Sequence, residues 1–242
     1  MHRADSHAEC RRHCSSIIEM TIEQAIDKRH SCRSYSAAPV SEGDRLILRR
    51  EIDKINAESC LHLQLMLDEP GVFSRFATFG TFHGASNYLA MVGPSKPGRE
   101  TEEKIGYYGE RLVLLAVTLG MQCCWVKMTY RKSSKVNVRP GEHFSCAISI
   151  GYPAADANMF EHKSKPIEQL CNCAEPMPDW FRKGMEAVMK APSSTNKQPV
   201  LFHLDKAGRV TADYKPTLYS FPVDLGIAKY HFEIGSGGHK VE

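Results

Sequence analysis

Small hydroxyl and amide side chains are concentrated in one short segment between two prolines, Ala191-Pro192-Ser193-Ser194-Thr195-Asn196-Lys197-Gln198-Pro199. Pro192 fixes its own φ and keeps Ala191 away from helical backbone angles, so the segment is expected to be a stiff loop that follows a helix. Its hydroxyls, amides and free backbone groups suit a planar polar ligand better than a metal ion or a phosphate alone. An ordinary Ser/Asn-rich loop is the alternative interpretation.

Two further segments carry cations that could hold an anion. The segment Arg29–Arg33 has two arginines around a serine, and arginine donates hydrogen bonds in a planar fork that matches phosphate oxygens. The segment Lys163–Lys165 has two lysines around a serine, so in an extended backbone both ammonium groups project to the same side. Taken alone, each segment is better explained as a solvated group of charges.

Considered together, these segments resemble the FMN-dependent nitroreductase family. The early pattern R-x-S-x-R-x-aromatic occurs at Arg29–Tyr35, and the long phrase A-P-S-S-x-N-x-Q-P occurs at residues 191–199. Gly151–Pro153 with Lys163–Lys165 is similar to the family's G-Y-P and K-x-[RK] tail, and Gly120–Val126 is similar to its G-L-x-x-x-W-[IV] segment. The resemblance extends over most of the chain.

The resemblance implies an α+β fold whose central, mostly antiparallel sheet is flanked by helices. It also implies FMN as the cofactor and NADH or NADPH as the reductant. The nicotinamide reduces the flavin by hydride transfer and leaves, and a small-molecule acceptor, an electron-poor nitroaromatic or quinone, takes the electrons in a ping-pong scheme. Because FMN carries the difficult chemistry, we assign no catalytic side chain and no metal ligand.

The family's cofactor contacts transfer to residues on three parts of this chain. The arginine segment and the two lysines are expected to hold the phosphate and ribityl end, with Arg33 near the polar edge of the ring. Trp125 and Val126 edge the pyrimidine ring, and the loop after Ala191 borders the isoalloxazine, where Gln198 braces the loop. The complete set is Arg29, His30, Ser31, Arg33, Trp125, Val126, Lys163, Lys165, Pro192, Ser193, Ser194, Asn196 and Gln198.

Two other functions are compatible with the same residues. A flavoprotein of this fold could instead fragment flavin, remove halogens or reduce unsaturated bonds. A non-enzymatic flavin-binding protein would hold a flavin that NAD(P)H does not bleach. A Cys/His metal module is a further alternative for the N-terminal residues His7, Cys10, His13 and Cys14.

Hydrophobic periodicity predicts the elements that position these segments. We expect helices over residues 22–28, 42–55, 106–120, 180–190 and 223–234, and strands over residues 61–67, 87–92, 121–127, 144–150, 200–204 and 209–214. In the second helix Leu46, Ile47, Ile52 and Ile55 are expected to face inward. Residues 171–178 are expected to form a linker.

Four phenylalanines mark the loop predicted over residues 68–84: Phe73, Phe76, Phe79 and Phe82. Such aromatic side chains could cover a flavin, and packing on the core is the alternative. Trp125 and the adjacent Cys123 and Cys124 lie in an apolar run, so the two cysteines are expected to be buried.

The two halves of the chain show a weakly similar order of elements. We therefore expect a flexible extension over residues 1–19, a nitroreductase-like lobe over 20–174, and a second lobe over 175–242 that completes the FMN site. In the family's usual homodimer, the arginine and serine-asparagine segments reach one flavin from different subunits. Because one chain holds both here, we expect a monomeric, fused pseudo-dimer with one FMN, and a domain-exchanged homodimer is the competing arrangement.

Bulk composition limits which other classes of protein remain possible, namely nucleic-acid-binding, membrane and disulfide-rich proteins. The 242 residues carry a formal net charge of only +3, which gives no basis for nucleic-acid or membrane binding. No apolar run approaches the roughly 20 residues of a membrane span. The nine cysteines are odd in number and irregularly spaced, which favours a reducing, cytoplasmic setting over a disulfide framework.

Overall fold

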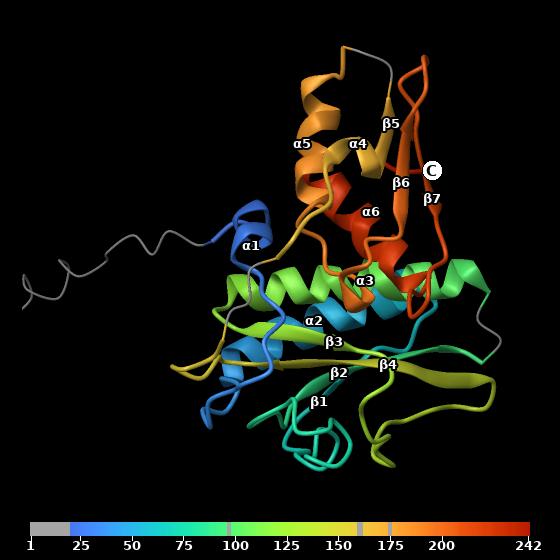
Figure 1. Ribbon diagram of the computed structural model, residues 1–242. Helices are drawn as coiled ribbons and strands as arrows, with labels where there is room; N and C mark the ends of the chain where they lie inside the picture. Colours follow the sequence, from blue (N-terminus) through green and yellow to red (C-terminus); the bar gives the residue numbers. More distant parts are fainter. Residues whose placement is uncertain (1–19, 96–97, 159–161, 174–175) are drawn as a thin grey trace, which may run out of the picture.

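The computed structural model describes residues 20–95, 98–158, 162–173 and 176–242 (Figure 1). The predicted extension over residues 1–19 and its metal-binding alternative lie outside these ranges. The elements are α1 (Ile22–Lys28), α2 (Glu42–Ser59), β1 (Gln64–Met66), β2 (Tyr88–Pro94), α3 (Arg99–Thr118), β3 (Gln122–Val126), β4 (Glu142–Gly151), α4 (Ile167–Leu170), β5 (Cys171–Cys173), α5 (Asp179–Val188), the 3₁₀ turn η1 (Ser194–Asn196), β6 (Val200–Leu204), β7 (Val210–Tyr214) and α6 (Val223–Gly235).

The first sheet is antiparallel throughout and has the strand order β1-β2-β4-β3. Both of its faces are buried. Alternate residues of a strand point to opposite sides, so each face packs into a different core cluster. Leu89 and Met91 pack into the cluster that includes residues of α2 and α3, whereas Tyr88 and Ala90 pack against Phe73 and other loop side chains. Side chains of β2 therefore contribute to two separate cores, and the strand is buried along almost its whole length.

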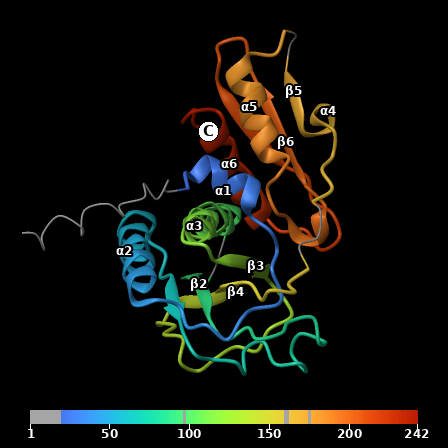
Figure 2. The same ribbon diagram turned by 90° about the vertical axis from the view of Figure 1, so that its left-hand side faces the viewer.

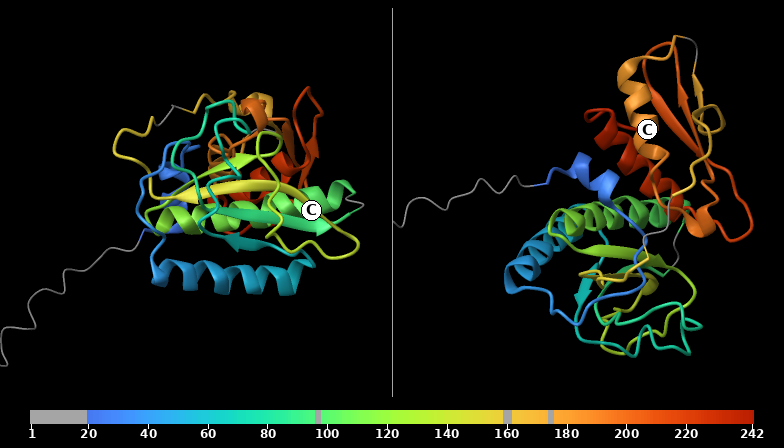
Figure 3. Two further views of the ribbon diagram at one scale, coloured as in Figure 1. Left: turned by 90° about the horizontal axis from the view of Figure 1, so that it is seen from below. Right: turned by 60° about the vertical axis from the view of Figure 1, so that its left-hand side comes forward.

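The second sheet has the order β5-β6-β7, in which β5 runs parallel to β6 and β7 runs antiparallel to it. Its core joins Phe202 of β6 to Phe181 of α5 and Phe232 of α6. Figure 2 shows this sheet with α5 and α6 on one side of α3, and the four-stranded sheet on the other. The right-hand view of Figure 3 shows the same order of layers.

Helices α3 and α6 hold the two sheets together through direct backbone contact. A Cβ at Gly226 of α6 would lie 1.8 Å from the carbonyl oxygen of Glu103 in α3, and a Cβ at Gly106 would lie 2.0 Å from the carbonyl oxygen of Val223. Only glycine permits such an approach, so these two residues set how closely the helices cross. The first turn of α6 is thereby fixed against α3.

The predicted fold class is confirmed: the chain is α+β with an antiparallel sheet flanked by helices. The division into lobes and the internal repeat stay predictions. The cysteines at 123 and 124 are buried, as predicted. A capping box formed by Thr21 and Gln24 begins α1.

Several local predictions were wrong. Leu46 and Ile47 are 49% and 40% exposed, because Leu48, Ile52 and Ile55 form the face of α2 that meets the core. Helix α3 begins at Arg99 rather than residue 106, and its charged first turns carry the pair Lys104–Glu100.

The predictions for two strand regions also needed correction. The strand expected over residues 61–67 is limited to β1, Gln64–Met66. The linker expected over residues 171–178 contains β5, whose pairing with β6 is a tertiary contact that no local pattern indicates. Helix α5 begins at Asp179, one residue before the predicted start, and no side-chain hydrogen bond caps it.

Candidate functional site

A cleft lies where the loop after α5 meets β3 and the first turn of α6. It is open to solvent, and about 150 Å³ of its space can hold the centre of a water-sized sphere. Its lining combines hydroxyl, cationic, aromatic and aliphatic side chains from five separate segments. The lining residues are Ser31, Arg33, Cys124, Trp125, Val126, Lys127, Cys146, Pro192, Ser193, Ser194, Thr195, Phe221, Val223, Asp224 and Ile227.

The cleft opens into an outer hollow of about 790 Å³, which shares Arg33, Trp125 and Ser194 with it. The outer hollow adds Phe82 and Tyr219, together with Thr81, Met128 and Thr129. Of the phenylalanines predicted to cover a ligand, Phe82 lines this hollow and Phe73 is buried beside it, with ring centroids 5.3 Å apart. Phe76 and Phe79 are exposed and line neither space.

The arginine segment forms the first wall because it pairs with the free edge of β3. Cys32 N donates to the carbonyl oxygen of Cys123 at 3.0 Å, and His30 N donates to Gln122 Oε1 at 2.9 Å. Since β3 is the last strand of its sheet, its unpaired backbone groups are available for this contact. Ser31 and Arg33 then reach the cleft, and Arg33 is exposed with no ion pair to any described residue.

The loop after Pro192 forms the second wall, and its backbone is strained. Thr195, Asn196 and Gln198 have φ values of 50°, 54° and 46°. A positive φ is costly for side chains other than glycine, and such conformations persist only where surrounding contacts enforce them. Here Ser193 Oγ accepts from Gln198 N at 2.8 Å, and Asn196 Nδ2 donates to the carbonyl oxygen of Lys163 at 2.8 Å.

The two lysines predicted to bind phosphate lie behind this loop. Lys165 Nζ donates to the carbonyl oxygens of Lys197 and Gln198 at 2.7 and 3.1 Å. Gln198 in turn accepts from Lys165 N at 2.8 Å and donates to the carbonyl oxygen of Lys163 at 2.9 Å. Neither lysine lines the cleft, and neither do Asn196 and Gln198. Their geometry supports the loop, and their role toward phosphate stays a prediction.

Arg29 belongs to a buried polar cluster instead of the cleft lining. Its Nε lies 3.9 Å from Glu110 Oε1, and Glu110 is fully buried on α3. Trp125 Nε1 donates to the other oxygen of Glu110 at 2.9 Å, and His231 Nε2 lies 2.9 Å from Oε1. One carboxylate thus connects the arginine segment, β3 and α6.

Two nitrogen atoms near this cluster are buried without a hydrogen-bond partner among the described residues, Arg29 Nε and His162 Nε2. Burial lowers the pKa of His162, and the charge of Arg29 lowers it further. An unpaired buried guanidinium donor is costly, and the nearby carboxylate of Glu110 offsets part of that cost.

Asp224 ties the two sides of the cleft together. Its Oδ1 accepts from Ser194 N at 2.9 Å, and its Oδ2 accepts from Phe221 N at 3.2 Å. Burial raises the pKa of Asp224 to about 6, although these hydrogen bonds and the charge of Lys127 act in the opposite direction. Lys127 is itself paired with Glu102 at 2.6 Å, so Arg33 is the unpaired cation of the lining.

The lining fits a flavin better than a metal ion. Isoalloxazine has a polar pyrimidine edge and an apolar dimethylbenzene edge, and the cleft offers hydroxyls and a cation beside apolar walls. Within the described residues, no group of three or more His, Cys, Asp or Glu side chains could hold a metal.

Sequence reasoning found the two walls but missed residues between them. Asp224, Lys127 and Phe221 line the cleft and were not among the predicted site residues. An acidic residue in the first turn of a helix is common for electrostatic reasons alone, so Asp224 gave no separate signal. Glu110 and His231 could have been noticed as polar residues on the apolar faces of their helices.

The fold and the cleft define a nitroreductase-like protein, and comparison with known proteins identifies the family. The family model described as "Putative TM nitroreductase" matches residues 21–236. The chain therefore belongs to this nitroreductase family, as the sequence motifs predicted. No curated protein matches the chain in sequence.

One solved structure shows the same fold, and two others are similar to part of the chain. A protein described as a putative nitroreductase from Thermotoga maritima matches with a TM-score of 0.64 and 24% identity, over 90% of this chain and 84% of that chain. A putative nitroreductase in complex with FMN from Desulfovibrio desulfuricans matches with a TM-score of 0.48 and 20% identity, over 65% of this chain and 98% of that chain. A nitroreductase with bound FMN from Bacteroides fragilis has a TM-score of 0.47 and 14% identity, over 60% and 94% of the two chains.

Among the residues that the structure describes, no helix is both long and apolar enough to cross a membrane.

Proposed function

We propose that the protein is an FMN-dependent oxidoreductase that passes electrons from NADH or NADPH to a small, electron-poor acceptor such as a nitroaromatic or a quinone. The observation that carries this proposal is the meeting of the arginine segment and the serine loop, distant in sequence, in one cleft along β3. Membership of the nitroreductase family supports it. The ping-pong order and a cytoplasmic location belong to the same proposal.

Each wall of the cleft has a distinct part in holding the cofactor. Bound FMN supplies the capacity to accept and release electrons, and the protein orients it and tunes its electronics. Arg33 offers a cation to the polar edge of the ring, which favours an anionic reduced flavin. Ser193 and Ser194 border the ring from the opposite wall, and β3 contributes Trp125 and Val126. Arg29 does not line the cleft, and its contact with FMN stays a prediction.

The proposal also includes the organisation of the chain as a pseudo-dimer. Residues on both sides of the proposed boundary between lobes 20–174 and 175–242 line the same cleft, which supports one FMN per chain. Native mass spectrometry with flavin quantification tests this arrangement. One FMN on a monomer is expected, and two FMN per chain would reject it.

The test of FMN binding uses Arg33→Ala. Because Arg33 is exposed and has no ion pair to a described residue, its loss leaves the fold intact. Loss of a charge-assisted hydrogen bond costs about 1.5–3 kcal/mol, which predicts FMN binding weaker by about ten- to hundredfold. Quenching of FMN fluorescence measures the dissociation constant. Arg49→Ala, on the exposed face of α2, is the control, and equal affinity in both variants would refute the placement.

A further inference from the structure

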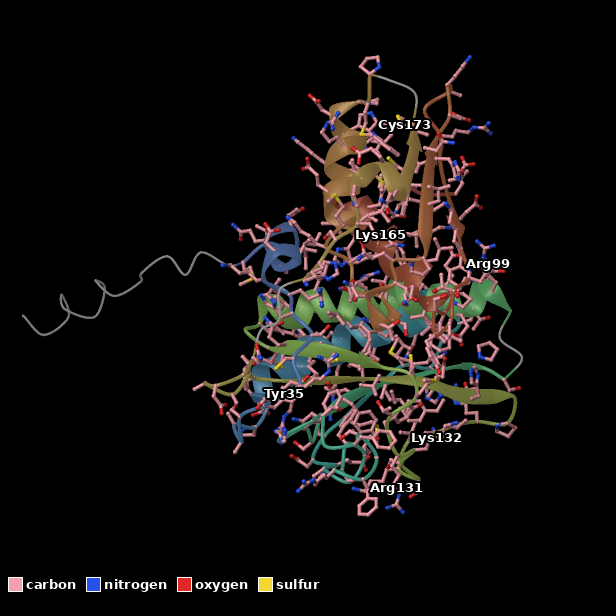
Figure 4. All side chains as sticks on the ribbon, in the orientation of Figure 1. Tyr35, Arg99, Arg131, Lys132, Lys165 and Cys173 are labelled. Carbon is pink, nitrogen blue, oxygen red and sulfur yellow. The ribbon has the colours of Figure 1, made fainter. Side chains whose placement is uncertain are left out.

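A second hollow, which we call the basic hollow, lies next to the outer part of the cleft. It is open to solvent, has a volume of about 350 Å³, and is formed by two loop segments, Asp68–Val72 and Arg131–Lys135. The second segment has the sequence Arg-Lys-Ser-Ser-Lys and leaves β3 only a few residues after the cleft. Figure 4 shows Arg131 and Lys132 on the side of the four-stranded sheet that faces away from α3.

The charges of the basic hollow are unevenly compensated. Lys135 Nζ pairs with Glu69 Oε1 at 3.1 Å, and the hydroxyl of Tyr88 donates to Glu69 Oε2 at 2.6 Å. Burial alone would raise the pKa of Glu69, but the hydrogen bonds from Tyr88, Ser133 and Lys135 outweigh it and the pKa is lowered. Glu69 is therefore ionised and offsets Lys135.

Two cations of the hollow remain without an acidic partner. Arg131 and Lys132 are exposed and form no ion pair with any described residue. Asp68 is the other acid of the lining and is exposed on the opposite segment. Three cations against two carboxylates leave the hollow net positive, with the hydroxyls of Ser133 and Ser134 beside them. This combination suits a phosphomonoester, which arginine can bind through two parallel hydrogen bonds.

The basic hollow and the outer part of the cleft are built from the same two stretches of chain. The first stretch supplies Val72 to the basic hollow and Phe82 to the outer hollow. The second stretch supplies Arg131 to the basic hollow and Thr129 to the outer hollow. The stretches are joined where Arg131 N donates to the carbonyl oxygen of Val72 at 2.9 Å. From Val126 to Lys132 the chain spans at most roughly 20 Å. A ligand of dinucleotide length can therefore reach from the cleft to these cations.

We propose that the basic hollow binds the 2′-phosphate of NADPH and makes the protein selective for NADPH over NADH. This inference rests on the proposed function, because the nicotinamide end must lie in the cleft for the adenosine end to reach Arg131 and Lys132. NADPH differs from NADH only by this phosphomonoester. The hollow consequently recognises the one group that distinguishes the two reductants.

The test measures binding directly, by isothermal titration of the full-length protein with 2′,5′-ADP, 5′-AMP and inorganic phosphate. We expect 2′,5′-ADP to bind about tenfold or more tightly than either of the others. The double variant Arg131→Ala, Lys132→Ala is expected to remove this preference. The double variant Arg49→Ala, Arg50→Ala on α2 removes the same charge elsewhere and is expected to retain it. Equal binding of 2′,5′-ADP and 5′-AMP would overturn the inference, and so would 2′,5′-ADP binding no tighter than phosphate.

A kinetic comparison separates this inference from the proposed function. In the flavin-loaded protein the Arg131/Lys132 double variant should lower kcat/KM for NADPH by about tenfold or more and leave that for NADH unchanged. Flavin content serves as the folding control. If the protein never binds FMN, the proposed function fails and the titration still tests the hollow. If NADPH and NADH reduce the flavin equally well before and after the substitutions, only the inference fails.

Discussion

Replacement of Asp224 by asparagine tests whether ionisation of this carboxyl group in the cleft lowers the unfolding free energy of the protein. Asp224 is 5% exposed and accepts the backbone N–H groups of Ser194 and Phe221. Burial raises its pKa from 3.8 to about 6. The difference between the two pKa values corresponds to about 3 kcal/mol.

The sign of the pH dependence follows from the raised pKa of Asp224. A carboxyl group whose pKa is higher in the folded state contributes stability that is fully present below pH 3.8 and is lost as pH rises through about 6. The wild-type protein should therefore lose about 3 kcal/mol of unfolding free energy through this group between pH 4 and pH 7.5. Asp224→Asn lacks the titration, so its stability relative to wild type should rise by the same amount.

Urea unfolding without added flavin, at pH 4, 6 and 7.5, measures this difference. Asp53→Asn is the matched control, because Asp53 is exposed on α2 and forms no ion pair with a described residue. The control should follow the wild-type pH dependence. Asp224→Asn should also bind FMN more weakly, because an amide has one acceptor oxygen for two backbone donors. Parallel pH profiles for wild type and Asp224→Asn would refute the reasoning.

Two other substitutions test the packing that supports the cleft. Gly226→Ala should lower the unfolding free energy by about 3 kcal/mol or more, because its Cβ would lie 1.8 Å from the carbonyl oxygen of Glu103. Gly43→Ala should be tolerated, because Gly43 is an exposed residue of α2 with space for a Cβ. Equal urea midpoints for the two alanine variants would contradict this account of the α3–α6 contact. Glu110→Ala should cost about 3–5 kcal/mol, because it leaves Arg29 buried without its counter-charge. A wild-type unfolding midpoint for that variant would show that the pair is dispensable.

Much of the fold is predictable from the sequence because its signals are local. Thr21 and Gln24 lie within one helical turn and form both hydrogen bonds of the capping box, at 2.9 and 3.3 Å. By contrast, the inward face of α2 depends on which side of the helix meets α3. Its apolar residues cover more than one face, so periodicity alone does not choose Leu48 over Leu46.

The parts of the candidate site that could be predicted are those whose residues lie close together in the sequence, as a contiguous motif. The segments around Arg33 and Ser193 are such motifs, and both reach the cleft. Asp224 acts through Ser194, and Glu110 acts through Trp125 and the arginine segment. These contacts join parts of the chain that are distant in sequence, so they emerge only when the helices are placed in space.

The visible spectrum of the purified protein, loaded with FMN and then titrated anaerobically with NADPH, tests the central claim most directly. Flavin held in the cleft should co-purify with or bind to the chain at one per copy, and its absorbance should bleach on addition of the reductant. Protein that stays colourless after incubation with FMN would contradict the claim.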